Sequence, residues 1–178
     1  MNKAPTKEKK KIVVIGGGNG AAKTLRALKR FEDEFELSAV MSMSDNGGST
    51  GRLREEFGVL PPGDIMRAVL SLSRIIEYKE LRTIFNKRRF TNLDKLEGHN
   101  LGNMMLTLFA KYTGDFMSGV RALEQAIDAA GKVYPVSTDI SDLCAELKNG
   151  ETIVGEHTID RPKVRDDEHR IVRVWLDP

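Results

Sequence analysis

The abrupt change from an apolar run to a glycine run near the N-terminus constrains this chain most. Residues 12–15 are four consecutive apolar residues, and residues 16–20 that follow are four glycines and one asparagine. An apolar run without polar alternation is typical of a strand that is covered on both faces of a parallel sheet. The periodicity of residues 21–31, with Leu25 and Leu28 on one stripe, predicts a helix directly afterwards. We therefore expect a central strand, a tight turn and a helix.

The glycines of this turn indicate a place where a phosphate approaches the backbone. Glycine adopts positive φ without strain, and the start of a helix offers free N–H groups and the positive end of its dipole. Gly16, Gly18 and Ala21 even match the dinucleotide spacing G-x-G-x-x-G/A. A tight connection without any ligand is the alternative, and this pattern alone does not separate the two.

Length, charge and cysteine content narrow the class of protein. A chain of 178 residues fits one domain with a core, and a net charge of +2 gives no general case for nucleic acid or an anionic membrane. Cys144 is the one cysteine, which excludes an intramolecular disulfide, and its apolar neighbours predict a buried thiol. Residues 1–11 are lysine-rich, and no following apolar run is long enough for a leader or a membrane span. We expect a disordered basic N-terminus, no membrane insertion and a cytoplasmic location.

A second glycine-rich loop, residues 44–54, follows the strand that we predict at residues 37–43. Ligands of open parallel sheets bind at the carboxyl ends of the strands, so the two loops should face one cleft. Asp45 has the chemistry to accept from a ribose hydroxyl or to hold a divalent cation such as Mg²⁺. A flexible surface loop is the alternative. Candidate partners for phosphate oxygens in this loop are Ser49, Thr50 and Arg52.

Two further polar positions precede apolar helices. Asp64 is interpreted as an N-cap, with a binding role as the alternative. Residues 98–103 combine two glycines with His99, Asn100 and Asn103. The imidazole is suited to donate a hydrogen bond or to act as a general acid or base, and the carboxamides are suited to bind a ring edge or a phosphate. Local capping, with His99 on the surface, is the alternative.

The rest of the chain predicts helices that lead into a small β-rich appendage. We expect Gly131 to end the second of these helices, and the basic cluster at residues 87–89 to be a solvated end of the first. An Asn-Gly pair between two alternating runs is a strong signal of a β-hairpin. Residues 139–178 should form the appendage. The predicted elements are helices at 80–90 and 116–127, an edge strand at 133–136, hairpin strands at 143–147 and 152–157, and a strand at 171–176.

Four separated motifs together resemble one family, at residues 13–20, 44–54, 58–64 and 98–103. They are similar to the N-terminal portion of the gluconeogenesis factor branch of the 2-phospho-L-lactate transferase (CofD-like) family, and the similarity extends over nearly the whole chain. The resemblance implies a Rossmann-like three-layer α/β fold with a mainly parallel sheet. It also implies a cytoplasmic protein with a nucleotide or nucleotide-sugar ligand over the strand ends. Residues 12–178 would then be an incomplete nucleotide-binding domain.

Two departures from the family pattern bear on function. Asn46 stands where the family usually has a second aspartate, and a carboxamide brings no charge and no base. Relatives of this branch continue past the strand that contains Trp175. We therefore expect either a fragment of a longer product or a sheet that another chain completes. Unpaired strands would favour self-association and a homo-oligomer.

The resemblance implies a regulatory protein that binds a UDP-sugar and links carbon metabolism to cell-wall synthesis and cell shape. The alternative is an enzyme, a transferase that moves a phosphorylated acid from a nucleoside diphosphate carrier to a deazaflavin alcohol with Mg²⁺. A third hypothesis, a nicotinamide-dependent dehydrogenase, is supported only by the glycine spacing. Candidate catalytic residues are Asp45, Asp64 and His99, with Asp45 also the metal candidate. Candidate ligand-binding residues are Gly16, Gly17, Gly18, Asn19, Gly20, Asn46, Gly47, Gly48, Ser49, Thr50, Arg52, Asn100 and Asn103.

Overall fold

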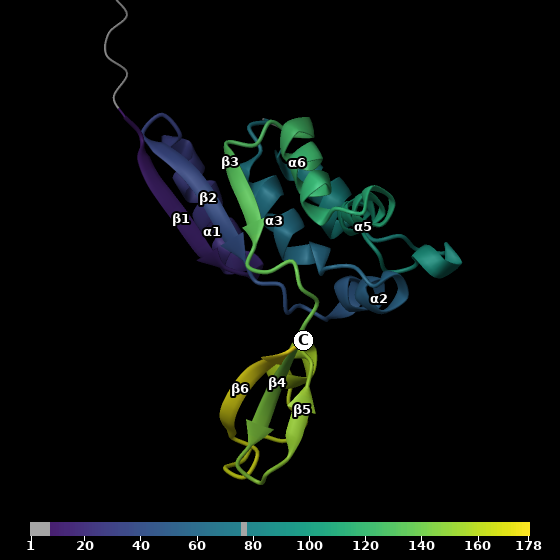
Figure 1. Cartoon of the computed structure of the whole chain (residues 1–178). Helices are drawn as coiled ribbons and strands as arrows, with labels where there is room; N and C mark the ends of the chain where they lie inside the picture. Colours follow the sequence, from purple (N-terminus) through teal and green to yellow (C-terminus); the bar gives the residue numbers. More distant parts are fainter. Residues whose placement is uncertain (1–7, 76–77) are drawn as a thin grey trace, which may run out of the picture.

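The computed structural model describes residues 8–75 and 78–178 and contains two separate sheets (Figure 1). One is a parallel sheet of order β1-β2-β3, and the other is an antiparallel sheet of order β5-β4-β6. Helices pack beside the parallel sheet, which confirms the α/β class with a β-hairpin appendage near the C-terminus. Of the N-terminal segment expected to be disordered, residues 1–7 lie outside the described residues, whereas Lys10 and Lys11 already belong to β1.

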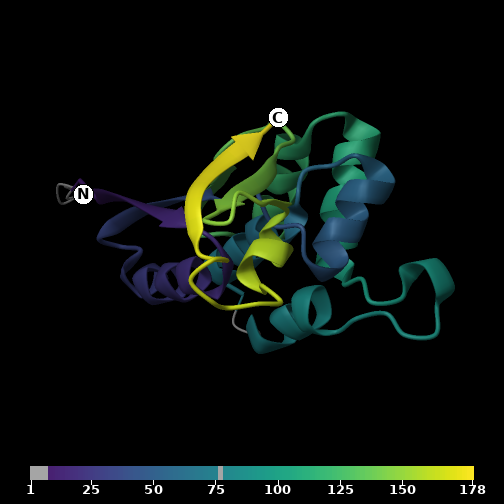
Figure 2. The same ribbon diagram turned by 90° about the horizontal axis from the view of Figure 1, so that it is seen from below.

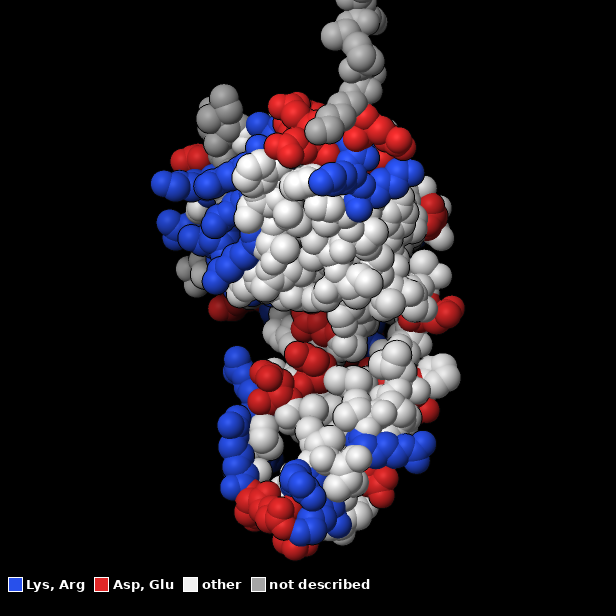
Figure 3. Space-filling view, turned by 90° about the vertical axis from the view of Figure 1, so that its left-hand side faces the viewer, with Lys and Arg blue, Asp and Glu red and all other residues white. Residues whose placement is uncertain are grey.

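The parallel sheet has one buried face and one open face. β2 (Phe35–Met41) is the middle strand, between β1 (Lys10–Gly16) and β3 (Gly131–Pro135). On the open face, Val13 is 55% exposed and Ile15 is 78% exposed. The expectation of a central, doubly covered strand at residues 12–15 is therefore wrong, because β1 is an edge strand with one uncovered face. In Figure 3, the part of the molecule that contains the parallel sheet, called the body below, shows a broad area without charged side chains. Self-association through such a surface stays a prediction.

The helices pack around α3, which is buried along nearly its whole length. The first predicted helix begins at Gly18, earlier than expected, and the helix expected over residues 80–90 ends at Lys87. Gly131 does not end α6; it opens β3, where a Cβ would lie 2.5 Å from the Leu37 carbonyl oxygen. The helices are α1 (Gly18–Leu28), α2 (Gly48–Phe57), α3 (Pro62–Leu72), α4 (Tyr78–Arg82), α5 (Leu101–Thr113) and α6 (Phe116–Ala126), with shorter turns η1 (Lys29–Phe31), η2 (Thr83–Lys87) and η3 (Asp94–Leu96).

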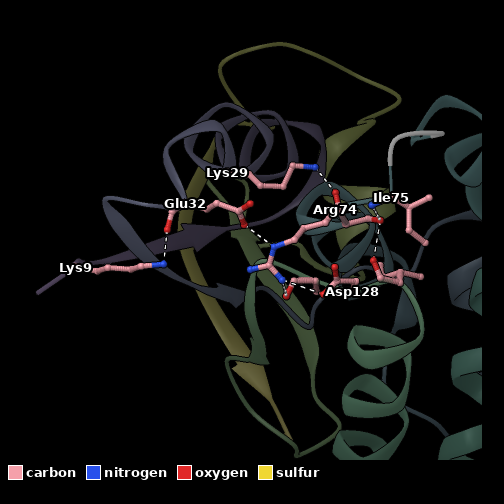
Figure 4. Close-up of polar contacts among 9 residues, drawn as sticks. Lys9, Lys29, Glu32, Arg74, Ile75 and Asp128 are labelled. Carbon is pink, nitrogen blue, oxygen red and sulfur yellow. Dashed lines mark hydrogen bonds and ion pairs between the residues drawn. The ribbon is translucent and has the colours of Figure 1, made fainter. Parts of the chain in front are cut away.

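Ion pairs and backbone contacts close the amino end of the parallel sheet (Figure 4). Arg74, just after α3, donates to Glu32 before β2 at 2.6 Å and to Asp128 before β3 at 3.0 Å. The buried Ser73 hydroxyl donates to the Ile127 carbonyl at 2.9 Å. These contacts fix the end of α3 to the segments that lead into β2 and β3.

The C-terminal lobe, residues 142–177, lies beyond the carboxyl ends of the parallel strands (Figures 1 and 2). The hairpin prediction is confirmed, because β4 and β5 pair antiparallel with Cys144 opposite Val154. Cys144 is buried as expected. The second run is shorter than predicted, because β5 stops at Val154 and a short helix follows. The elements are β4 (Asp142–Leu147), β5 (Thr152–Val154), α7 (Glu156–Asp160) and β6 (Ile171–Asp177). Within the described residues, no helix has the length and apolar character that crossing a membrane requires.

Candidate functional site

A polar cleft of ≈ 720 Å³ lies between the carboxyl ends of the parallel strands and the C-terminal lobe. Four helices of eight or more residues begin at its wall. Free N–H groups and the positive dipole end occur at a helix start, so converging starts create a region suited to an anion. The residues that bring these starts to the cleft are Gly18 of α1, Gly48 of α2, Gly63 of α3 and Asn100, the N-cap of α5.

Asp64 holds the first glycine loop against α3. The Gly18 N–H donates to the Asp64 carboxylate at 2.8 Å, and the Arg67 guanidinium donates to the other oxygen at 2.6 Å. A Cβ at Gly17 would lie 2.6 Å from Asp64 Oδ2, so the close approach requires glycine there. The expectation that Asp64 caps its own helix is wrong, because Pro61 occupies the N-cap. Its carboxylate instead serves the first turn of α1.

Burial and a neighbouring carboxylate raise the pKa of two carboxyl groups at the cleft, Asp64 and Glu156. Burial raises the pKa of Asp64, the Gly18 N–H and Arg67 act against this, and Asp45 adds to it. Burial also raises the pKa of Glu156, with Asp45 as the next cause. Figure 3 shows acidic side chains gathered where body and lobe meet. The cleft therefore combines positive helix ends with negative side chains.

The second glycine loop turns tightly into α2. Asp45 Oδ1 accepts from the Gly47 N–H at 2.9 Å, a local turn contact of the kind that aspartate forms with the backbone two residues on. A Cβ at Gly51 would lie 2.0 Å from the Asn46 carbonyl oxygen, so only glycine permits this approach. The loop therefore presents the backbone of Gly48 and the side chain of Asp45 at the cleft.

Asn46 connects the second loop to the C-terminal lobe. Its Oδ1 accepts from the His157 N–H at 2.8 Å, in the first turn of α7. A Cβ at Gly155 would lie 2.3 Å from Asn46 Nδ2, so this approach also depends on glycine. The carboxamide thus acts at the start of α7, and Asn46 is not among the residues that line the cleft.

The histidine–asparagine motif packs against α2 behind the cleft. His99 is 1% exposed, which contradicts a surface position, and its Nδ1 lies 2.9 Å from Ser49 Oγ. Burial lowers the pKa of His99, and the Arg52 guanidinium lowers it further. Asn100 Oδ1 accepts from the Asn103 N–H at 2.8 Å, so local capping is confirmed for this residue. The Asn103 amide nitrogen lies 3.4 Å from the Ser49 hydroxyl.

The structure brings eleven of the candidate residues to one cleft and places five elsewhere. Arg52 is exposed and donates to the Glu97 carbonyl at 2.7 Å, so it holds the segment before Gly98. His99 lies behind Ser49, and Asn46 acts at α7. Gly16 and Gly20 flank the first loop but do not line the cleft. The lining candidates are Gly17, Gly18, Asn19, Asp45, Gly47, Gly48, Ser49, Thr50, Asp64, Asn100 and Asn103.

Most of the lining residues that the sequence did not predict come from helices or from the C-terminal lobe. Arg67 lies one turn into α3, where a regular helix gives no local signal of a site. Arg89 belongs to the basic cluster that we interpreted as a solvated helix end, yet it donates to the Gly98 carbonyl at 2.7 Å and lines the cleft. The other missed lining residues are Ser42, Ser44, Gly63, Asn86, Glu156, His157, Asp160 and Arg161.

The donor set for a cation is small. In the described part of the chain, no group of three His, Cys, Asp or Glu side chains forms a metal cluster. Asn46 is engaged with α7, and one oxygen of Asp45 accepts from Gly47. Mg²⁺ commonly uses one or two carboxylates together with ligand phosphates. A magnesium ion at Asp45 would therefore depend on oxygens that the ligand itself supplies.

Fold and cleft together define an α/β protein with a ligand cleft at the ends of parallel strands, built from glycine loops and helix starts. The family model described as 2-phospho-L-lactate transferase CofD matches residues 12–178, so the chain belongs to this family. This confirms the resemblance carried by the four sequence motifs.

Relatives within the family include gluconeogenesis factors. The chain is 37% identical over 171 residues to the gluconeogenesis factor of Halalkalibacterium halodurans, covering 96% of this chain and 50% of the relative. It is 37% identical over 167 residues to a putative gluconeogenesis factor of Thermotoga maritima, covering 94% and 50%. A crystal structure from Bacillus halodurans, of a member of the UPF0052 family, matches with a TM-score of 0.83 at 34% identity, covering 97% of this chain and 52% of that one. The chain spans about half the length of the curated relatives it matches.

Proposed function

We propose that this chain carries the nucleotide-sugar cleft of a cytoplasmic regulatory protein of the gluconeogenesis factor type, which links carbon metabolism to cell-wall synthesis and cell shape. The observation that carries the proposal is the convergence of four helix starts on one cleft. Such starts favour a ligand with more than one phosphate group. The names of the relatives support the regulatory role.

The lining places different chemistries in different parts of the cleft. The backbone N–H of Gly48 and the Ser49 hydroxyl offer donors to a diphosphate at the cleft, whereas the Gly18 N–H already donates to Asp64. Asp45 and Glu156 offer acceptors to hydroxyl groups, which a ribose or a sugar presents in number. We therefore place the diphosphate at the helix starts and the sugar toward the carboxylates.

The transferase remains the alternative function within the same family. It requires charge neutralisation at the phosphate by a cation or a guanidinium, for which Asp45 with Mg²⁺ and Arg67 are the available groups. Position 46 is a carboxamide that is engaged with α7, so Asp45 is the single carboxylate of loop 44–54 for this task. The regulatory function therefore fits the donor set better.

Calorimetric titration of the 178-residue chain with UDP-N-acetylglucosamine, GDP and NAD, each with and without Mg²⁺, tests the proposal. We expect saturable binding of the UDP-sugar that does not require Mg²⁺. Binding of GDP only with Mg²⁺ would instead support the transferase, and turnover of labelled donor would establish it. Absence of binding by every ligand would overturn the assignment of this cleft.

A matched pair of serine variants locates the ligand. Ser49→Ala removes a hydroxyl at the cleft, whereas Ser38→Ala removes one from β2 on the open face of the sheet. We expect Ser49→Ala to weaken UDP-sugar binding about tenfold, as expected for a hydrogen bond to a charged group. Ser38→Ala should leave the affinity unchanged. Equal affinities for both variants would place the ligand elsewhere.

A further inference from the structure

Ser49, His99 and Asn103 form a buried polar cluster immediately behind the cleft. Each of the three is at most 4% exposed. His99 Nδ1 lies 2.9 Å from Ser49 Oγ, and Asn103 Nδ2 lies 3.4 Å from the same oxygen. Ser49 also lines the cleft, whereas His99 does not. The direction of the hydrogen bonds in this cluster therefore decides what Ser49 offers to a ligand.

The surroundings of His99 Nε2, the ring nitrogen that does not face Ser49, determine that direction. His99 Nε2 is buried and has no hydrogen-bond partner in the described part of the chain. If Nδ1 accepted from Ser49, the ring proton would sit on Nε2 as a buried donor without an acceptor. Buried N–H groups without a partner are rarer than acceptors with unused capacity. The tautomer with the proton on Nδ1 leaves only a lone pair at Nε2, so Nδ1 is the donor and Ser49 Oγ the acceptor.

Burial and two nearby guanidinium groups disfavour the charged form of this ring. The groups that act on His99 are the guanidinium groups of Arg52 and Arg89 and the carboxylate of Glu56. Burial and the two guanidinium groups lower the pKa of His99, and Glu56 acts against them. A neutral ring carries one proton, and the cluster geometry places it toward Ser49.

A serine hydroxyl has one hydrogen and two acceptor lone pairs. Accepting from His99 and from the Asn103 amide uses both lone pairs, and no acceptor within the described residues takes the hydrogen. The cleft is the open direction, because Ser49 lines it. We propose that His99 and Asn103 are positioning residues that aim the Ser49 hydrogen into the cleft, so that Ser49 is a fixed donor to an unprotonated anionic oxygen and not a nucleophile.

This inference rests on the proposed function and adds selectivity to it. A donor with fixed direction binds a phosphoryl or carboxylate oxygen and leaves an amine or another donor unpaired. His99 in this tautomer has no free lone pair facing Ser49, so it does not accept the hydroxyl proton. The cluster therefore favours binding of a diphosphate over covalent chemistry at Ser49.

Nitrogen NMR of the histidine rings tests the direction without any ligand. The chain has three histidines, so labelling with ¹⁵N-histidine gives few signals, and the variant His99→Asn identifies those of His99. We expect the wild-type protein at pH 7 to show a neutral His99 ring with its proton on Nδ1. A proton on Nε2, or an imidazolium ring, would overturn the inference.

Binding measurements with UDP test the consequence. His99→Leu removes the donor to Ser49, whereas His99→Asn retains an amide group at the position of Nδ1. We expect Ser49→Ala and His99→Leu each to weaken UDP binding about tenfold, the double variant to bind no more weakly than either, and His99→Asn to stay within about threefold of wild type. Wild-type affinity in His99→Leu, or additive losses in the double variant, would contradict the inference.

The two proposals fail in different ways. If wild-type protein does not bind UDP or a UDP-sugar, the proposed function is overturned, while the NMR signal of His99 still decides the direction of the hydrogen bond. Urea unfolding of each variant separates a loss of binding from a loss of folded protein. If His99→Leu does not fold, the wild-type tautomer and the rescued variant His99→Asn still carry the test.

Discussion

The two ends of the parallel sheet treat charge in opposite ways. At the amino end, Arg74 lies between Glu32 and Asp128 and forms an ion pair with each of them (Figure 4). At the carboxyl end, Asp45, Asp64 and Glu156 surround a cleft, and neighbouring carboxylates contribute to a raised pKa for the last two. The amino end is complete in itself, whereas the carboxyl end has groups that a ligand would complete.

Because of this difference, we expect residues at one end of the sheet to act mainly on stability and residues at the other end mainly on ligand affinity. Paired charges at the amino end add modestly to the free energy of unfolding. Buried carboxylates placed near one another at the carboxyl end cost stability, which sites commonly accept in exchange for function. Changes at the amino end should therefore alter unfolding but not affinity, and changes at the carboxyl end should alter affinity first.

The largest expected effect is the loss of ligand binding in Gly17→Ala. The new Cβ would lie 2.6 Å from Asp64 Oδ2 and push the first loop away from α3. We expect UDP-sugar affinity to fall by more than about tenfold, and the free energy of unfolding by about 1–3 kcal/mol, as for overpacked sites. Calorimetry and urea unfolding provide the two readouts.

Gly20→Ala is the matched control for this prediction. Gly20 lies inside α1, and a Cβ there meets no atom within 4 Å. Alanine favours a helix interior by about 0.5–1 kcal/mol over glycine, so this variant should be slightly more stable than wild type. Similar binding losses in both variants would show that the contact with Asp64 is not the cause.

Arg74→Met should weaken the amino end alone. It removes both ion pairs of a side chain that is 42% exposed, and we expect the free energy of unfolding to fall by about 1 kcal/mol in low salt. Affinity for the UDP-sugar should stay within twofold of wild type. Arg30→Met, at an exposed arginine of η1, is the control and should change stability by less. A large loss of UDP-sugar affinity in Arg74→Met would show that the two ends of the sheet are coupled, which would contradict this prediction.

Asp64→Asn should change how stability depends on pH. The pKa of Asp64 is raised in the folded protein, so the folded state binds the proton more tightly than the unfolded state does. The stability from this group is complete below the ordinary value of 3.8 and is lost as pH rises through the raised pKa. Wild type should therefore lose stability relative to Asp64→Asn over this interval, by at most about 1.4 kcal/mol per pH unit. Urea unfolding between pH 3.5 and about 7 measures the difference; a constant difference would contradict it.

The smallest expected effect belongs to Asp128→Asn. Its carboxylate is 67% exposed and forms one of the two pairs of Arg74, so we expect a loss of a few tenths of a kcal/mol that disappears in high salt. Urea unfolding at two salt concentrations measures it, with the exposed Asp33→Asn as control. A loss that persists in high salt would mean that backbone contacts, not charge, are responsible.

Local patterns predicted much of this fold because the signals lie within short segments. The change from apolar residues to glycine at Gly16 predicts β1 and α1, and the Asn149-Gly150 pair predicts the β4–β5 hairpin. The convergence of the loops on one cleft follows from the rule for parallel sheets. The open face of β1 was not predictable in this way, because an apolar run looks the same whether or not another layer covers it.

Contacts between distant segments account for what sequence analysis missed at the cleft. Asn46 and His157 are 111 positions apart, so no local pattern indicates that the carboxamide serves α7. His99 is buried because α2 packs on the start of α5, which its polar neighbours gave no reason to expect. Asp64 shows the same effect. Its position in the sequence predicts that it caps its own helix, but its carboxylate accepts from Gly18, which lies 46 positions earlier.

The order of the parallel strands also has a consequence for how the chain acquires this fold. β1, α1 and β2 are neighbours in sequence and form one unit, whereas every helix from α2 to α6 lies between β2 and its partner β3. Pairing across so long a segment requires closure of a large loop, which slows folding. During synthesis, the edge of β2 that pairs with β3 therefore stays unpaired until Gly131–Pro135 has left the ribosome. The interval before that pairing is when this sheet is most exposed to capture by another strand.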